Sequence, residues 1–328
     1  MVWEAVDAIA DAWEATRTLV WPPVVRSWLV LGVVVFFVTG ASTANPSINL
    51  NLGEPAVPWL SRHALGAGYF DPATLTLVVI AVSGFIAVSL AYGLVAAMLE
   101  FTFVTIARSK EVRLRGNVGP YFGFGLQLLL LRIAIGGDIL VAAVAVTLLL
   151  GLLGGWFMLL LVLASPMLLV AGMVVWGVLR FTVDFVVPIM LIDEVGILQG
   201  WRRFATELRL KWWEYGLYAI LRIILGIIAT AVVSAGFILL AILLAIPFGI
   251  IGALAWLMAA AFLVEPAASL VLYGVGALYL VSAMLASVVV LHVPVQTYLR
   301  YYALLVLARV SPEWDVFAAE STDRTMAP

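Results

Sequence analysis

Long apolar stretches dominate the pattern along the chain, and polar residues gather between them. Five stretches are long enough for membrane-spanning helices: residues 75–99, 133–153, 156–179, 223–246 and 270–291. About 20 apolar residues, at about 1.5 Å each, cover a hydrocarbon core about 30 Å thick. A shorter apolar stretch at 24–40 contains Arg26 and is the weakest span. The pattern predicts an all-α polytopic membrane helix bundle with six transmembrane helices.

One apolar segment leaves a seventh span open. Residues 248–264 number only 17 and lie between Pro247 and Glu265-Pro266, so they fit a short span or a re-entrant or interfacial piece. Basic residues at 108–115, at 202–211 and after residue 291 identify cytosolic segments by the positive-inside rule. Seven spans would put the C-terminal arginines outside. We therefore expect six spans in the cell membrane, with both termini cytosolic.

The first 23 residues predict a cytosolic amphipathic acidic helix. Its carboxylates recur at helical spacing opposite an apolar face and are Glu4, Asp7, Asp11 and Glu14. An acidic face is repelled by anionic lipid, so the helix is expected to dock under the bundle against basic residues of 108–115 or 202–211. Apolar contacts of Trp3, Ile9 or Trp13 would supply most of the attachment. Residues 311–328 are expected to form a flexible cytosolic tail.

The membrane domain, residues 24–310, shows signs of an internal repeat over 75–153 and 156–246. Glu100-Phe101 closes one inward span and Asp184-Phe185 closes another. The sequences LLLRIAIG at 129–136 and AILRIILG at 219–226 then open the outward spans. Both units travel in the same direction, so a duplication would relate them by an axis along the membrane normal. Chance similarity between apolar runs that follow an arginine is the alternative.

Composition limits the chemistry. The chain is 65% apolar and 11% charged, with a net charge of −2, so it offers no basic stripe for nucleic acid. It contains no cysteine and only two histidines, which excludes disulfides and thiolate sites and leaves no metal-ligand set. We expect no catalytic residue, cofactor or metal. The expected partners are the lipid bilayer, anionic lipid headgroups and other membrane proteins.

Ionisable residues close to the spans are the candidate site residues, because burial of a charge in a bilayer is costly. They are Glu100, Arg132, Asp138, Arg180, Asp184, Arg222 and His292. All but Asp138 lie at predicted cytosolic span ends, where they form either a structural ring of ion pairs or a vestibule for an anionic headgroup or solute.

Asp138 lies about 9 Å deeper than Arg132 along the same helix. An unpaired carboxylate at that depth is costly, so Asp138 is expected to face the bundle and pair with Arg180 or Arg222. The alternative is a proton or cation site. His292 is expected to be a hydrogen-bonded helix-end residue, with a ligand or proton-relay role as the alternative.

The segment PIMLIDEVGILQGWRRF at 188–204, followed by Leu221-Arg222-Ile223, resembles an uncharacterised family of haloarchaeal multi-pass membrane proteins. It is more distantly similar to the membrane domain beside some glycerophosphodiester phosphodiesterases. The matching residues are Pro188, Glu194, Gly196, Gly200, Arg202 and Arg203. The resemblance implies a six-span membrane domain of unknown activity. The phosphodiesterase catalytic barrel has no counterpart here, so no catalytic residue carries over.

The leading functional hypothesis is a non-enzymatic scaffold or accessory membrane protein. The alternative is a small solute or ion transporter, or an anionic-lipid-binding protein, that uses Asp138 and the arginine and acid ring. A lipid-modifying enzyme would need a nucleophile and a base, which the sequence does not bring together. A solid core would favour the scaffold. A cavity at the midplane around Asp138 would favour transport, and a cationic pocket at the headgroup level would favour lipid binding.

Overall fold

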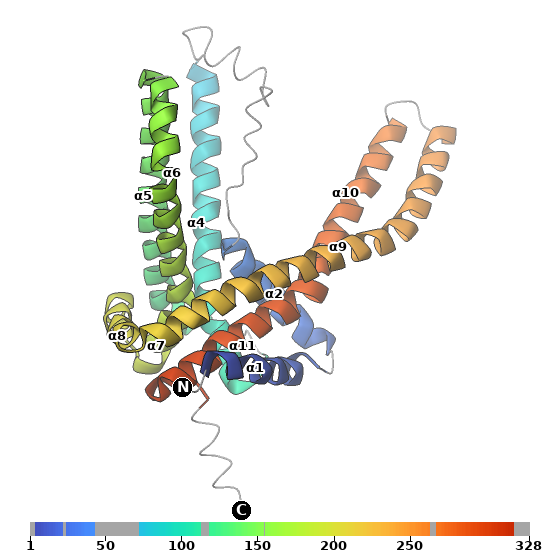
Figure 1. Cartoon of the computed structure of the whole chain (residues 1–328). Coiled ribbons are helices and arrows are strands. Elements are labelled where there is room, and N and C mark those ends of the chain that lie inside the picture. The colour runs from blue at the N-terminus through green and yellow to red at the C-terminus, as the bar shows by residue number, and fades with distance from the viewer. Residues whose placement is uncertain are drawn as a thin grey trace, which may run out of the picture.

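The computed structural model describes residues 4–21, 24–42, 72–112, 118–153, 155–262 and 267–317, and in these residues the secondary structure is helical, with no strand. The long helices are α1 (Glu4–Val20), α2 (Val25–Ser42), α4 (Pro72–Ser109), α5 (Phe122–Leu153), α6 (Gly155–Phe181), α9 (Trp212–Phe262), α10 (Ala267–Ser287) and α11 (Val293–Val310). Short elements connect them: η1 (Gly119–Tyr121), η2 (Thr182–Val186), α7 (Val187–Asp193), α8 (Ile197–Leu210), η3 (Val288–His292) and η4 (Pro312–Trp314). Figure 1 shows their arrangement.

Five helical segments of the described chain are long and apolar enough to cross a membrane. They are Thr76–Ser109, Gly119–Leu149, Leu160–Asp193, Trp212–Ala259 and Ser269–Val310. The sixth predicted span corresponds to α2, whose apolar part Val25–Gly40 is shorter than the about 20 residues of a typical span. The structure thus supports a helical membrane protein with five clear candidate spans.

The apolar segment after Pro247 is not separated from the preceding span by a turn. It continues α9 to Phe262, so that α9 is a single helix of 51 residues, about 76 Å long. Helix α10 then returns along α9, with which it packs closely. Pro247 lies inside α9, where the missing N–H does not end the helix. Figure 1 shows α9 curving upward toward its C-terminal end.

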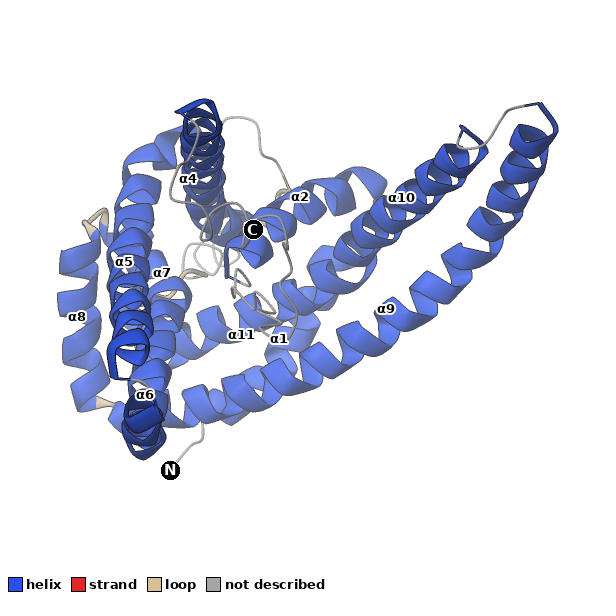
Figure 2. Cartoon of the chain, turned by 90° about the horizontal axis from the view of Figure 1, so that it is seen from above, coloured by secondary structure: helices blue, strands red, loops and turns tan. Residues whose placement is uncertain are grey.

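The helices form a buried base from which two arms diverge. One arm consists of α4, α5 and α6, and the other of α10 with the C-terminal half of α9 (Figures 1 and 2). The base contains the main core, built from α1, α7, α8, α11 and the adjoining ends of α4, α5 and α9. Side chains along the arms are apolar yet exposed, as at Leu163 (80%) and Leu243 (64%). Such surfaces are stable in a bilayer, where lipid chains cover them.

An aromatic cluster fixes α8 and the start of α9 to the base. The Phe185 ring lies 5.2 Å from Phe204, 5.1 Å from Tyr215 and 4.7 Å from Tyr218, measured between ring centroids. All four side chains are fully buried. This packing positions the backbone around Asp184, which directly precedes Phe185.

The α7–α8 turn explains most of the motif at 188–204. Pro188 occupies the first turn of α7, where a proline N–H is not needed, and Glu194 ends α7 in the left-handed region with φ 51°. The backbone N–H of Ile197 donates to Gln127 Oε1 of α5 at 2.9 Å. A Cβ at Gly200 would lie 3.0 Å from Val186, so a larger residue would push α8 away from η2.

Helix α1 docks under the bundle with the predicted Ile9 packed against the core, but its ion-pair partner differs from the prediction. It packs against α11 and α9, and its ion pair joins Asp11 to Arg309 rather than to residues 108–115 or 202–211. The buried face is a row of small residues that includes Ala5, Ala8 and Ala12. Trp13 is 65% exposed and only its edge contacts Tyr298, while Trp3 lies outside the described residues. Small side chains let α1 and α11 approach closely. Bulky side chains such as Trp13 would hold the two helices farther apart.

The predicted flexible tail begins with an ordered segment. Trp314 and Val316 are buried, and Trp314 Nε1 donates to Asp193 Oδ2 at 3.1 Å. Residues 311–317 therefore belong to the base. The remainder of the predicted tail, 318–328, and the segment 43–71 lie outside the described residues.

The small-residue face of α1 leads to a stability prediction. Ala8→Leu inserts three carbons into a fully buried contact and should lower the free energy of unfolding by about 1–3 kcal/mol. Ala10→Leu makes the same change on the exposed face and should have little effect. Thermal unfolding in detergent measures both. Equal effects of the two substitutions would show that α1 does not dock through this face.

Candidate anion-binding site

Arg300 lies at the centre of a buried charge cluster in the base. Its guanidinium group forms an ion pair with Glu100 of α4, and its Nη1 lies 3.5 Å from Asp184 Oδ1 in η2. Nη1 also donates to the backbone oxygen of Val183 at 2.7 Å. Both acids are fully buried and Arg300 is 4% exposed. One cation from α11 therefore connects α4 with the η2 segment that follows α6.

Three further arginines surround the two acids. Arg132 Nη2 of α5 lies 3.1 Å from Glu100 Oε1, and Arg180 Nε of α6 lies 2.8 Å from Asp184 Oδ2. Arg222 Nε of α9 lies 3.6 Å from the same Asp184 oxygen. Tyr218 completes the set, since its hydroxyl donates to Asp184 Oδ2 at 2.7 Å. Four arginines thus share two carboxylates.

The cluster joins the corresponding acid and arginine of each predicted repeat unit. In the first unit Glu100 pairs with Arg132, and in the second Asp184 pairs with Arg222. Arg300 contacts both acids. The acid and the arginine are 32 residues apart in the first unit and 38 in the second. Helices α7 and α8 lie between Asp184 and Arg222 and account for the longer separation in the second unit. A duplication would produce this arrangement, and the duplication itself stays a prediction.

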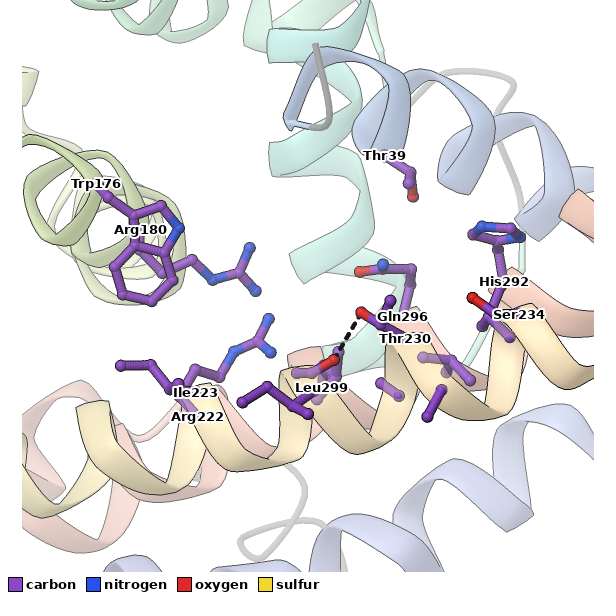
Figure 3. Close-up of a pocket in the computed structure, with 16 residues that line it drawn as sticks. Thr39, Trp176, Arg180, Arg222, Ile223, Thr230, Ser234, His292, Gln296 and Leu299 are labelled. Atoms are coloured by element: carbon purple, nitrogen blue, oxygen red, sulfur yellow. Dashed lines mark hydrogen bonds between the residues drawn. The ribbon is translucent and has the colours of Figure 1, made fainter. Parts of the chain in front are cut away.

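A cavity of 860 Å³ opens beside the cluster, between α6, α9, α2 and α11. Figure 3 shows Arg180 and Arg222 at one end, with their guanidinium groups directed toward each other. Gln296, Ser234 and His292 line it farther along, and Thr39 faces them from α2 (Figure 3). The wall also contains apolar side chains such as Trp176 and Ile227. The cavity therefore combines a cationic end, a neutral polar end and apolar walls.

Arg222 is the cation that the protein leaves least satisfied. Its side chain is 6% exposed, and it makes no hydrogen bond with any described residue. Its ion-pair distance of 3.6 Å exceeds hydrogen-bond range. A buried guanidinium without hydrogen bonds is costly, and it carries five N–H donors. An anion in the cavity could accept hydrogen bonds from these donors.

Asp138 does not pair as predicted. Arg180 and Arg222, its expected partners, both contact Asp184 instead. Asp138 is exposed on α5, and it forms no ion pair with the described residues. Asp138 does not line the cavity, so the structure separates it from the cluster.

His292 hydrogen-bonds within its own turn. Its Nδ1 lies 3.1 Å from the backbone oxygen of Ser287, so it is hydrogen-bonded as expected, but η3 joins α10 to α11 without a break and His292 is not at a helix end. It also lines the cavity. Among the described residues no group of three or more His, Cys, Asp or Glu side chains could hold a metal ion.

Sequence reasoning missed Arg300, Gln296, Thr230 and Ser234. The sequence pattern places Arg300 among the basic residues after the last span, although this residue lies inside α11. A four-residue spacing could have found them. Polar or small residues recur at 222, 226, 230 and 234 on α9, and at 292, 296 and 300 on α11, so each set lies on one helix face.

A second, smaller cavity of 510 Å³ lies between the end of α4, the start of α5 and α7. Arg108, Tyr121 and Glu194 contribute to its lining. None of the candidate residues from the charge cluster lines it.

Comparison with known proteins identifies a family but no activity. The model of a family of unknown function, DUF7544, matches residues 3–317, so the chain belongs to this family. No curated protein and no solved structure matches the chain.

The central position of Arg300 predicts a large effect on stability. Arg300→Met removes the cation shared by two buried acids and should lower the free energy of unfolding by about 3–5 kcal/mol. Arg309→Met removes an exposed pair from the same helix and should cost about 0–1 kcal/mol. Thermal unfolding in detergent tests both. Similar losses for the two variants would contradict the central role of Arg300.

Proposed function

We propose that this member of the DUF7544 family binds the headgroup of an anionic lipid at the cytosolic side of the cell membrane. The observation that carries the proposal is Arg222, which is buried, lines the cavity and lacks a hydrogen-bond partner among the described residues. Arg180 lines the same end of the cavity. Paired guanidinium groups suit phosphate oxygens because they donate from a fixed planar fork.

The walls of the cavity favour a lipid over a soluble anion. Trp176 of α6 and Ile223 and Ile227 of α9 line the cavity and are also exposed. Helix α6 belongs to one arm, and the N-terminal half of α9 leads into the other, so apolar side chains on both helices would contact acyl chains in a bilayer (Figure 1). A lipid could therefore enter from the side, with its headgroup against the arginines and its chains between the arms.

Asp138 gives the transport alternative less support, because it lies away from the cavity and from the arginines. The scaffold alternative requires no cavity, and no described feature specifically favours it. Similarity of the α7–α8 segment to the membrane domain beside glycerophosphodiester phosphodiesterases, and a haloarchaeal origin, remain proposals that rest on the 188–204 motif.

We also propose six membrane crossings with both ends cytosolic. Helix α1 packs on α11 in the base, whereas α4 begins at the far end of its arm (Figure 1). The chain between α1 and α4 must then cross once, and α2 is the apolar helix in that interval. The basic segments 108–115 and 202–211 join the cytosolic ends of the arms.

Arg222→Gln tests lipid binding. It removes the cavity's least-satisfied cation, so the affinity for an anionic phospholipid should fall about tenfold, which corresponds to the loss of one charge-assisted hydrogen bond. Arg202→Gln removes an exposed arginine from α8 and should leave the affinity within about twofold. Native mass spectrometry of detergent-solubilised protein with phosphatidylglycerol measures both. Unchanged binding by Arg222→Gln would rule out the proposed site.

Single cysteines test the orientation, since the natural chain has none. Cysteines introduced at Ser109 and Ser321 should resist an impermeant thiol reagent added outside cells, and one at Ser61 should react. Labelling of 321 without labelling of 61 would refute six crossings with cytosolic ends.

A further inference from the structure

The polar groups of the cavity follow two helix faces that run away from the arginines. On α9, Arg222 is followed at four-residue steps by Gly226, Thr230 and Ser234. On α11, Arg300 is preceded at the same spacing by Gln296 and His292. The distance along α9 from Arg222 to Thr230 is about 12 Å, and that along α11 from Arg300 to Gln296 is about 6 Å. A bound headgroup therefore meets polar groups well beyond the arginines.

The charge cluster has two positive charges in excess, and one of the two arginines that line the cavity has no close acidic partner. Asp184 accepts a close pair from Arg180 at 2.8 Å, and Glu100 pairs with both Arg300 and Arg132. Arg132 does not line the cavity, so Arg222 is the cavity cation without a close acidic partner. A ligand with a single negative charge would supply the partner that Arg222 lacks. A phosphodiester carries that charge.

The opposite end offers both donors and acceptors. Among the described residues, the Gln296 amide and the Ser234 hydroxyl have no hydrogen-bond partner, and both line the cavity. The Ser287 carbonyl can only accept, so His292 Nδ1 donates to it, and the ring also lines the cavity. An amide and a hydroxyl each donate to and accept from an alcohol group. This end therefore matches alcohol groups.

We infer that the lipid is a phosphodiester whose headgroup carries a hydroxylated substituent, a polyol or a sugar. This inference rests on the proposed function and adds the chemical class of its ligand. The phosphate accepts from Arg180 and Arg222, and the hydroxyls bond to Gln296, Ser234 and His292. Thr230 can also accept, because its hydroxyl already donates to the Gly226 carbonyl at 2.8 Å (Figure 3).

Native mass spectrometry with two lipids of matched acyl chains tests the inference. The probes are phosphatidylinositol, which carries a polyol, and phosphatidic acid, which has none. The wild-type protein should bind phosphatidylinositol about tenfold more tightly, the effect of one or two added hydrogen bonds. Ser234→Ala combined with Gln296→Leu should abolish this preference and leave the affinity for phosphatidic acid within about twofold. Asp138→Asn, a substitution outside the cavity, should leave both affinities unchanged.

The outcomes separate the two proposals. Equal binding of both lipids by the wild-type protein, with both weakened by Arg222→Gln, would overturn the polyol inference and keep the anionic-lipid function. Insensitivity of both lipids to Arg222→Gln would overturn both. Ser234→Ala alone changes an exposed residue. The preference of this single variant for phosphatidylinositol over phosphatidic acid can therefore be measured even if the variant with Gln296→Leu does not fold. Equally tight binding of glycerophosphoinositol, which has no acyl chains, would identify a soluble ligand and refute the lipid assignment.

Discussion

The ion pairs of Arg300 hold the base together, and most of the remaining structure depends on them. A buried guanidinium must keep its acidic partners close, because water cannot replace them. Glu100 lies in the last third of α4 and Asp184 in η2 directly after α6, so their shared cation fixes both helices against α11. Between α6 and the C-terminal half of α9, the described residues form no comparable polar contact. The arms can therefore diverge above a base that stays closed.

The helices and the two acids could be predicted from the sequence because the apolar runs and the motifs at Glu100 and Asp184 are local signals. The positions of α9 and Arg300 could not. Pro247 indicated a break in α9, yet the packed α10 supports the helix past it. Arg300 followed the last apolar run and matched the positive-inside pattern, so its charge was assigned to water. Only the fold shows that α11 carries it back into the core.

Helix α1 shows a similar limit of pattern analysis. Amphipathicity identifies an apolar face, but the closest packing belongs to the face whose side chains are small. Ala5, Ala8 and Ala12 bring α1 against α11, while Trp13 stays largely exposed. In a membrane protein the exposed aromatic can contact lipid headgroups, so its exposure is not a cost as it would be in water. Residue size thus centred the contact on the alanine row, with Ile9 and Val20 of the apolar face packed beside it.

The same cluster gives its arginines different roles. Arg300 has an ion pair and a backbone acceptor, so its hydrogen-bonding capacity serves the fold. Arg222 is almost as buried, but the oxygen nearest to it, Asp184 Oδ2, has two lone pairs and already accepts from Arg180 and Tyr218. A protein that needed only a rigid base would gain nothing from this surplus cation. Because the surplus faces a cavity between the arms, an external anion is the group that can satisfy it.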